Sequence, residues 1–481
     1  MRILLQSLLL PLIFWGRVGF GADQPLSSRA MEAMRKAVDF YQSQVASHGG
    51  YVYRYSADLQ KREGEGKVGP ETVWVQPPGT PAVGLAYLDA FERTRQPWLL
   101  DAAKRAGDCL IQGQLRSGGW QDRIEFASDA RAKVAYRVDL ARRRARNLTS
   151  FDDDKTQSAM RFLMRLDEAL DFRDAPTHEA IQYALDSVLK AQFPNGAWTQ
   201  VYDSFPEPKL FPVKAATCPS DWPRQYPGGD YWLHYTLNDN AISDTIDALL
   251  LAERIYHEPR YRDAAIRAGE FLLLAQLPAP QPAWAQQYST EMYPVWARKF
   301  EPPAVSGGES QGVIQTLLDL FVETEDKRFL DAVAPAIKYL QGSLLPDGRL
   351  ARFYELQTNK PLYFTRDYQL THNDSDVPTH YSFKVSSRLD SLANQSTRLT
   401  SSSPQDLKDL REQRFRVARQ RPSDKSVAAV IASLDGRGGW VEDGRLRYHG
   451  ANDDTRRIID SGTFIHNLAI LSSYLDSRPT K

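Results

Sequence analysis

Two predicted helix starts in this chain are unusually rich in carboxylate and amide side chains. Residues 149–154 read Thr-Ser-Phe-Asp-Asp-Asp before a helical pattern at 156–172, and residues 236–240 read Thr-Leu-Asn-Asp-Asn before a pattern at 240–256. An N-cap accounts for one Asp or Asn per helix, but less well for a cluster. If both helices are inner members of consecutive repeats, Asp152 and Asp239 converge and offer the oxygen ligands that Ca²⁺ prefers. We therefore treat this pair as a candidate calcium site.

Four arginines lie beside aromatic residues in the sequence, namely Arg123, Arg298, Arg352 and Arg366. Taken singly, each is explained by a salt bridge or by a solvated guanidinium. Taken together, they favour an anionic polymer as ligand, because a guanidinium binds a carboxylate bidentately while a flat ring supports a sugar face.

Other chemistry is excluded by what the sequence lacks. It contains no Gly-rich phosphate loop, no Gly-x-Ser-x-Gly and no His-Glu-x-x-His motif, and its eight histidines are scattered. Lys+Arg and Asp+Glu are balanced at 60 each, so neither a nucleic-acid partner nor a membrane-binding basic face is expected.

The elements that must position these residues form a repeat. A Gly-Gly-Trp turn or a relative of it follows one amphipathic helix after another, at residues 49–51, 118–120, 196–198, 282–284, 347–349 and 438–440. A helix pair joined by a glycine turn cannot bury its apolar face alone and must stack on its neighbours. The repeat predicts a ring of helical hairpins around a central cleft.

Apolar residues at helical spacing predict further helices at 29–46, 81–95, 98–114, 178–192, 260–276, 310–323, 328–342 and 463–476. Strand-like alternation is confined to short pieces, such as residues 50–55 and 352–354. The expected fold is therefore all-α, an α/α toroid with short β pieces and long loops. The Pro-rich segment 203–235 is interpreted as an insertion and the polar segment 386–425 as a loop region.

The first 22 residues have the layout of a secretory signal peptide, with Arg2, an apolar run and small residues near Gly21. We expect residues 23–481 to form a single domain that is secreted or periplasmic, monomeric and without a membrane span. Cys109 and Cys218 could pair, but Cys109 lies in a helical pattern, so a disulfide is not expected.

Several motifs occur in one order along residues 110–385. They are residues 114–120 (Gln-Leu-Arg-Ser-Gly-Gly-Trp), 151–152 (Phe-Asp), 194–200 (Pro-Asn-Gly-Ala-Trp-Thr-Gln), 236–241 (Thr-Leu-Asn-Asp-Asn-Ala), 297–303 (Ala-Arg-Lys-Phe-Glu-Pro-Pro), 352–356 (Arg-Phe-Tyr-Glu-Leu) and Arg366. Together they resemble the pectate lyases of polysaccharide lyase family ten, the pectic acid lyases.

This resemblance implies Ca²⁺-assisted β-elimination of polygalacturonate. It assigns the metal to Asp152 and Asp239 and the abstraction of the C5 proton to Arg366. It also implies that the substrate is bound by Arg352, Arg298, Asp153, Arg123 and Trp198. Arginine is an unusual base because its guanidinium is normally protonated. Nearby cations would favour its neutral form. The hypothesis requires Asp152, Asp239 and Arg366 to meet in one pocket.

The sequence also departs from the family pattern. Where the family usually has Asp-Asn-Gly-Ala, residues 152–155 read Asp-Asp-Asp-Lys, so that Asp153 replaces an amide and Lys155 adds a positive charge. Two alternatives stay open. One is an inverting glycoside hydrolase acting on a uronate polymer with the same carboxylates, since fold does not fix function. The other is a polysaccharide-binding protein without catalytic activity.

Overall fold

The computed structural model describes residues 24–140, 144–417 and 420–476, so the signal peptide expected at residues 1–22 lies outside the described residues. Its long helices agree with those predicted from the apolar spacing. They are α1 (Leu26–Phe40), continued by the π-helix η1 (Tyr41–Val45), α2 (Thr80–Thr94), α3 (Pro97–Gln112), α5 (Lys155–Ala169), α6 (Ala175–Ala191), α7 (Ala241–Tyr256), α8 (Pro259–Ala275), α9 (Gly307–Thr324), α11 (Val333–Gly342) and α15 (Ser461–Tyr474). The fold is all-α, as the periodicity predicts.

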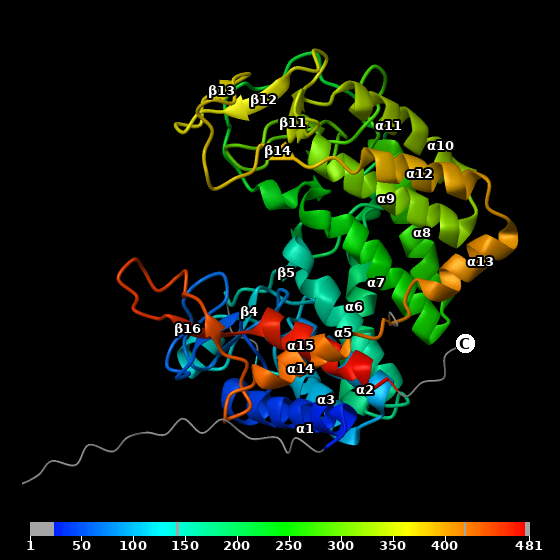
Figure 1. Ribbon diagram of the computed structural model, residues 1–481. Helices are drawn as coiled ribbons and strands as arrows, with labels where there is room; N and C mark the ends of the chain where they lie inside the picture. The colour runs from blue at the N-terminus through cyan, green and yellow to red at the C-terminus, as the bar shows by residue number, and fades with distance from the viewer. Residues whose placement is uncertain (1–23, 141–143, 418–419, 477–481) are drawn as a thin grey trace, which may run out of the picture.

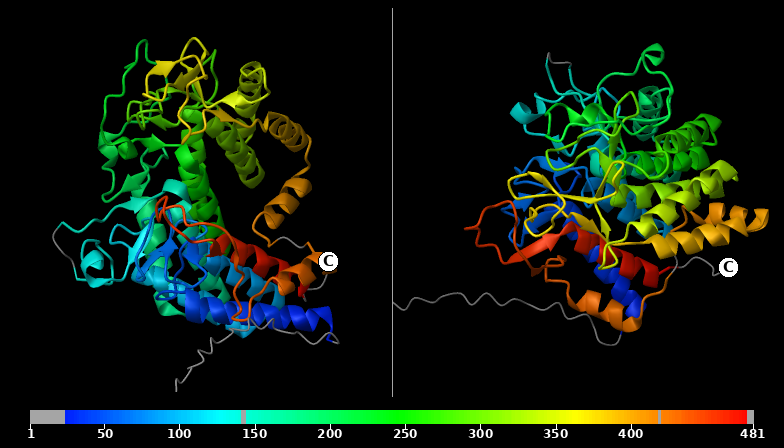
Figure 2. Two further views of the ribbon diagram at one scale, coloured as in Figure 1. Left: turned by 60° about the vertical axis from the view of Figure 1, so that its left-hand side comes forward. Right: turned by 90° about the horizontal axis from the view of Figure 1, so that it is seen from above.

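These helices stack as hairpins in a curved double row (Figures 1 and 2). Along the inner row α15 contacts α2, α2 contacts α5, α5 contacts α7, and α7 contacts α9. Inner helices also pack against helices adjacent in the chain, as α2 does with α3, α5 with α6, α7 with α8 and α15 with α14. This is the α/α toroid arrangement, in which every hairpin buries its apolar face against its neighbours.

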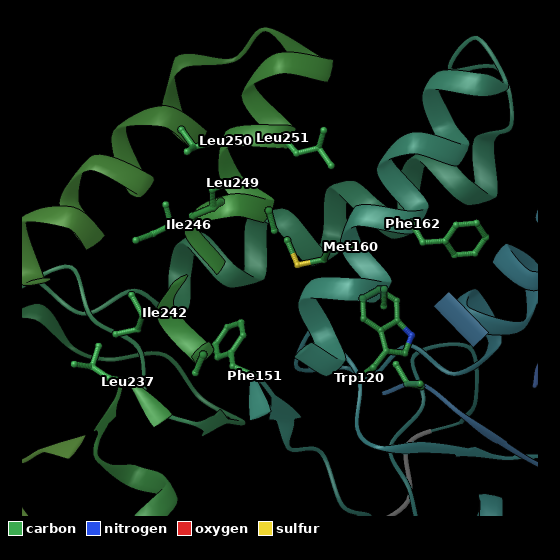
Figure 3. Close-up of a cluster of buried hydrophobic side chains, with 14 of the residues drawn as sticks. Trp120, Phe151, Met160, Phe162, Leu237, Ile242, Ile246, Leu249, Leu250 and Leu251 are labelled. Atoms are coloured by element: carbon green, nitrogen blue, oxygen red, sulfur yellow. The ribbon is translucent and has the colours of Figure 1, made fainter. Parts of the chain in front are cut away.

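The inner helices share one hydrophobic core. Figure 3 shows Met160 of α5 in a cluster with Ile242, Ile246 and Leu249 of α7. Phe151, which precedes the first acidic turn, belongs to the same buried cluster. The position of that turn is therefore tied to the core.

The repeated turns hold one hairpin against the next. Gln114 donates from its amide both to the carbonyl of Gly118 in its own turn and to Ala180 of the next hairpin, and Gln192 does the same with Gly196 and Ala264. Four of the six turns carry a tryptophan. Its ring is buried, and its indole N–H donates to a carbonyl of the preceding helix, as in Trp120 to Leu110 at 2.8 Å. The repeat is thus explained by hydrogen bonding and packing.

Short strands connect the hairpins. They are β1 (Arg54–Ser56), β2 (Arg62–Glu63), β3 (Thr72–Trp74), β4 (Arg123–Glu125), β5 (Thr149–Ser150), β6 (Val201–Tyr202), β7 (Tyr235–Thr236), β8 (Gln287–Tyr288), β9 (Ala304–Ser306), β10 (Leu350–Ala351), β11 (Phe353–Glu355), β12 (Pro361–Phe364), β13 (Leu370–Thr371), β14 (Lys384–Val385), β15 (Glu442–Asp443) and β16 (Arg457–Asp460). The antiparallel sheets β15-β16-β1-β2 and β13-β12-β11-β9 have four strands each. The remaining pairs are β3–β4, β5–β6, β7–β8 and β10–β14. Strands β5 and β7 each lead directly into one of the two acidic turns.

The remaining helices are α4 (Ser128–Arg131), α10 (Lys327–Asp331), α12 (Leu389–Thr400), α13 (Pro404–Gln413) and α14 (Asp424–Ala432). The prediction of a loop region at 386–425 is therefore wrong, because α12 and α13 lie inside it. Both helices are polar overall, but each has a narrow apolar face. The buried residues of these faces are Leu389, Leu392, Leu399 and Leu407. The insertion 203–235 does lack long elements, having only the 3₁₀ turns η3 (Pro208–Leu210) and η4 (Tyr231–Leu233) before β7.

Cys109 is buried and Cys218 partly buried, and both are free thiols. Within the described ranges, no helix combines the length and the apolar character needed to cross a bilayer.

Candidate active site

The two acidic segments form a matched pair of turns. The 3₁₀ turn η2 (Asp152–Asp154) precedes α5, and η5 (Asn238–Asn240) precedes α7; the two turns are in contact. Both contain two consecutive left-handed residues, Asp153 and Asp154 at φ 46° and 60°, and Asp239 and Asn240 at φ 51° and 59°. Residues other than glycine are uncommon in this conformation and cluster at functional sites. The turns therefore present their side chains at some conformational cost.

The structure brings three carboxylates together at these turns. One oxygen from each of Asp152, Asp153 and Asp239 lies within 4.8 Å of the other two. The expected convergence of Asp152 with Asp239 is thus present in the geometry, and Asp153 joins it. Three such oxygens form a donor set suited to a hard divalent cation.

Asp152 is tightly held by the protein. Its Oδ1 accepts a hydrogen bond of 2.6 Å from the Gln200 amide, and its Oδ2 accepts one of 2.7 Å from the Lys155 ammonium. In the other turn, Asn238 donates to Asp239 Oδ2 at 2.6 Å and itself accepts from Gln286 at 3.0 Å. These bonds fix the orientation of the carboxylates.

The crowding of negative charge changes the proton affinities of the cluster. Desolvation, followed by the charges of Asp153 and Asp152, raises the pKa of Asp239 to about 7. Desolvation and the charge of Asp152 also raise the pKa of Asp153. Burial alone would lower the pKa of Lys155, but Asp152 and Asp153 outweigh it and the pKa is raised. The cluster therefore favours a bound positive charge.

Arg298 faces this cluster from the segment between β8 and β9. Its guanidinium donates bidentately to Glu301 at 2.7 and 2.6 Å, and it lies over the rings of Phe300 and Tyr381. Burial would lower the pKa of Arg298, but the bonds to Glu301 raise it, with a contribution from Asp239. Arg298 is thus a permanent cation next to the carboxylates.

Arg352 lies between β10 and β11 on the same side of the molecule. Its Nε donates to the Ser382 carbonyl at 2.6 Å, and its guanidinium lies 4.7 Å from the Tyr381 ring centre. A looser ion pair of 3.6 Å joins Arg352 to Glu309, whose charge also acts on Asp239. Tyr381 is therefore shared by both arginines.

No interaction among the described residues joins Arg366 to the carboxylates. It lies in the turn between β12 and β13 with 69 % of its side chain exposed, and its described ion pair is with Asp376 at 3.3 Å. Figure 1 shows this hairpin at the outer edge of the molecule, apart from β5, which leads into η2. The meeting of Asp152, Asp239 and Arg366 in one pocket therefore stays a prediction. The β12–β13 hairpin belongs to the sheet with β11 and β9, and its Phe364 and Tyr368 pack against the segment that carries Arg298.

The two other predicted substrate contacts differ from each other. Trp198 is only 2 % exposed and its indole N–H donates to Val188 at 2.9 Å. Its assignment to substrate is therefore wrong, because the ring fills the core under its own turn. Arg123 lies over the Trp74 ring and pairs with Asp122. The negative charge of Asp122 acts on Lys155, so Arg123 lies at the edge of the carboxylate cluster.

Sequence reasoning missed the tyrosines of the site. Tyr381 is largely buried between the arginines, and Tyr231 comes from the insertion 203–235. Partial burial raises the pKa of Tyr231, on which the charges of Arg298, Asp152 and Asp239 also act. The Pro-rich insertion therefore reaches the carboxylate cluster, and no local pattern around Tyr231 signalled this.

Comparison with known proteins gives one family and several similar folds. Residues 114–350, just under half of the chain, match the sequence model of the family described as pectic acid lyase. No curated protein sequence matches the chain.

Among solved structures, the chain is similar to a family 10 polysaccharide lyase from Cellvibrio cellulosa, with 19 % identity and a TM-score of 0.46 over 66 % of this chain and 97 % of that one. A variant of that lyase in complex with trigalacturonic acid matches at 18 % identity and the same TM-score, over 66 % and 98 %. A D-mannose isomerase matches with 13 % identity and a TM-score of 0.45 over 95 % and 100 %.

The matched segment contains both acidic turns, Arg298 and the start of the β10–β11 region. The family recognised from the motifs is confirmed by the family match. Residues 114–350 of this chain are thus similar in sequence to the pectic acid lyases.

Proposed function

We propose that this protein is a secreted pectate lyase that cleaves polygalacturonate by calcium-assisted β-elimination. The observation that carries the proposal is the convergence of Asp152, Asp153 and Asp239 near Arg298, which shares the Tyr381 ring with Arg352. The three aspartates and Arg298 lie within the segment matched to the pectic acid lyases, and Arg352 lies close to its end. An anionic polymer needs positive charge for its carboxylates and a cation for the reacting unit, and these side chains offer positions for both.

The residues present fit a calcium ion. Three carboxylate oxygens lie close together, and burial followed by the charges of neighbouring carboxylates raises the pKa of Asp153 and of Asp239. Asp153 and Asp239 would hold the ion, with Asp152 beside them. When bound there, calcium would neutralise a uronate carboxylate and so stabilise the negative charge that builds next to C5 as the proton leaves.

The chain's own residues bind and orient the polymer. Arg298 and Arg352 are placed to receive uronate carboxylates on neighbouring sugar units, and Tyr381 between them offers a ring. The backbone and side-chain bonds to Ser382 and Glu301 hold both guanidinium groups in place before substrate arrives. Such preorganisation lowers the cost of positioning C5 for proton loss.

The proton-abstracting base is assigned to Arg366 by family resemblance alone. Its exposed pair with Asp376 is worth only about 0–1 kcal/mol and is easily exchanged for substrate. Arg366 can act on C5 only if the β12–β13 hairpin approaches the bound polymer.

The geometry disfavours the hydrolase alternative. An inverting hydrolase needs two carboxyl groups about 6.5–9.5 Å apart to admit a water molecule. The carboxylate oxygens of Asp152, Asp153 and Asp239 approach within 4.8 Å, which suits a shared cation better than an attacking water.

The decisive experiment incubates the purified chain with de-esterified pectin, with and without added calcium, and follows ultraviolet absorbance. A lyase forms unsaturated ends that absorb, and a calcium chelator should suppress them. Highly methyl-esterified pectin serves as the control substrate, because its blocked carboxylates cannot engage Arg298 or Arg352. New reducing ends without absorbance would show a hydrolase, and binding of oligogalacturonate without any product would show a non-catalytic relative.

A further inference from the structure

We infer that Lys155 neutralises Asp152 inside the carboxylate cluster, so that Asp153 and Asp239 form the working cation-binding pair. The inference deepens the proposed function and rests on it. It assigns a role to Lys155, which stands where the family usually has alanine. It also replaces Asp152 by Asp153 as the metal ligand contributed by the first acidic turn.

The two turns of this chain provide an internal comparison. Placing the left-handed residues Asp153 and Asp239 in register matches Asp152 with Asn238 and Lys155 with Ala241. The supporting amides match as well, since Gln200 donates to Asp152 and Gln286 donates to Asn238. One turn therefore carries a charged pair where the other carries a neutral pair.

Asp152 is the carboxylate of the cluster whose negative charge is already paired within the protein. Both of its oxygens accept short hydrogen bonds, one from Gln200 and one from Lys155. The Lys155 side chain is only 11 % exposed, because it begins helix α5 against the turn, and its ammonium is held against the cluster. A buried ion pair of this kind is costly to separate.

Charge counting gives the consequence. When all three are ionised, as cation binding requires, Asp152, Asp153 and Asp239 carry three negative charges; Lys155 cancels one, which leaves two for a divalent ion. Since cation affinity follows the charge of the ligand set, Lys155 weakens calcium binding relative to three open carboxylates. Lys155 is thus a positioning residue that sets the affinity of the site.

The test measures calcium binding by isothermal titration calorimetry on the metal-free full chain, without substrate. Lys155→Ala releases Asp152 and should tighten calcium binding by about tenfold or more. Asp152→Asn leaves the ammonium unpaired beside the ion and should weaken binding by about tenfold. The double variant Asp152→Asn/Lys155→Ala copies the second turn and should return to within about threefold of wild type.

Lys104→Ala is the matched control, because Lys104 of α3 also pairs with two aspartates, Asp108 at 3.2 Å and Asp174 at 2.9 Å, away from the carboxylate cluster. It should leave calcium binding unchanged. Equal affinities for wild type and Lys155→Ala, or no recovery in the double variant, would overturn the inference. Circular dichroism of each variant checks that it has folded.

Turnover of de-esterified pectin separates this inference from the proposed function. If all variants form unsaturated product but bind calcium equally, the role of Lys155 is wrong and the lyase assignment stands. If the calorimetric pattern holds and no variant forms product, the Lys155 inference stands and the lyase assignment is wrong.

Discussion

At the scale of single residues, the site depends on aspartates in an unfavourable backbone conformation. The backbones of Asp153 and Asp239 adopt the left-handed conformation, which costs residues other than glycine about 1–2 kcal/mol. A helical or extended residue at either position would point its carboxylate elsewhere. Both turns accept this cost at the same position, and both lie directly before an inner helix.

The roles of the arginines can be separated by kinetics. If Arg366 is the base, Arg366→Ala should lower kcat by about 10²–10⁴-fold and leave KM nearly unchanged. Arg352→Ala should instead raise KM, because its guanidinium is placed to bind a carboxylate next to Tyr381. The measurement is steady-state turnover of de-esterified pectin by ultraviolet absorbance.

Arg349→Ala is the control for these variants, since Arg349 is exposed and pairs with Asp347 at 2.7 Å. It should behave as wild type. A kcat of Arg366→Ala within twofold of wild type would remove Arg366 from the base role, in keeping with its position outside the carboxylate cluster.

Asp244, one turn into α7, predicts a pH dependence of stability. Burial and the charge of Asp154 raise its pKa from 3.8 to about 7. A raised pKa means that the folded protein holds the proton more tightly than the unfolded chain. This contribution to stability is complete below about pH 4 and is lost as pH rises through about 7.

Asp244→Asn should remove the part of the stability decrease at rising pH that comes from ionisation of Asp244. Thermal unfolding between about pH 4 and pH 8 should show the Tm of the variant improving relative to wild type as pH rises. Asp263→Asn, on the exposed face of α8, should show a constant difference from wild type. A constant difference for Asp244→Asn as well would contradict the prediction.

At the scale of the elements, the turns fix the distance between hairpins. Gly196 has φ +90°, and a Cβ there would lie 1.9 Å from the carbonyl oxygen of Arg267 on the next outer helix. Gly49 and Gly438 approach the carbonyls of Arg105 and Lys36 in the same way. The glycine of the turn is therefore required for close packing between repeats as well as for its backbone conformation.

Gly196→Ala and Gly348→Ala separate these two requirements. Gly348 also has a positive φ of +76°, but a Cβ added there would meet no atom of the described residues within 4 Å. Gly348→Ala should cost about 1–2 kcal/mol from backbone strain. Gly196→Ala should cost about 1–3 kcal/mol more, because the backbone of α8 must move. Chemical denaturation measures both, and equal losses would show that the close approach to Arg267 is unimportant.

At the scale of the whole molecule, the polar segment after α12 ties distant helices together. Arg414, directly after α13, pairs with Asp247 of α7 at 2.5 Å and with Asp319 and Glu323 of α9 at 3.6 and 3.4 Å. Its neighbour Phe415 lies beneath the guanidinium of Arg254. The segment interpreted as a loop from composition thus contributes to tertiary packing.

Replacing Arg414 should destabilise the fold. Arg414→Met leaves Asp319 and Glu323 partly buried without their cation, at a cost of about 1–3 kcal/mol. Arg416→Met is the control, because its pair with Glu412 at 3.5 Å is exposed on both sides. A lower Tm for Arg414→Met alone is expected, and similar values for the two variants would show that the connection to α7 and α9 carries no stability.

The sequence by itself determined the helices, the repeated turns and the types of residue in the site. Apolar spacing, turn glycines and acidic helix starts are local properties, and their reasons lie in neighbouring residues. Tertiary structure decided which of these residues meet. It brought Tyr231 from the insertion to the carboxylates, buried Trp198 and left Arg366 exposed in the turn between β12 and β13. These outcomes depend on how loops of variable length pack over the hairpins, and no short stretch of sequence contains that information.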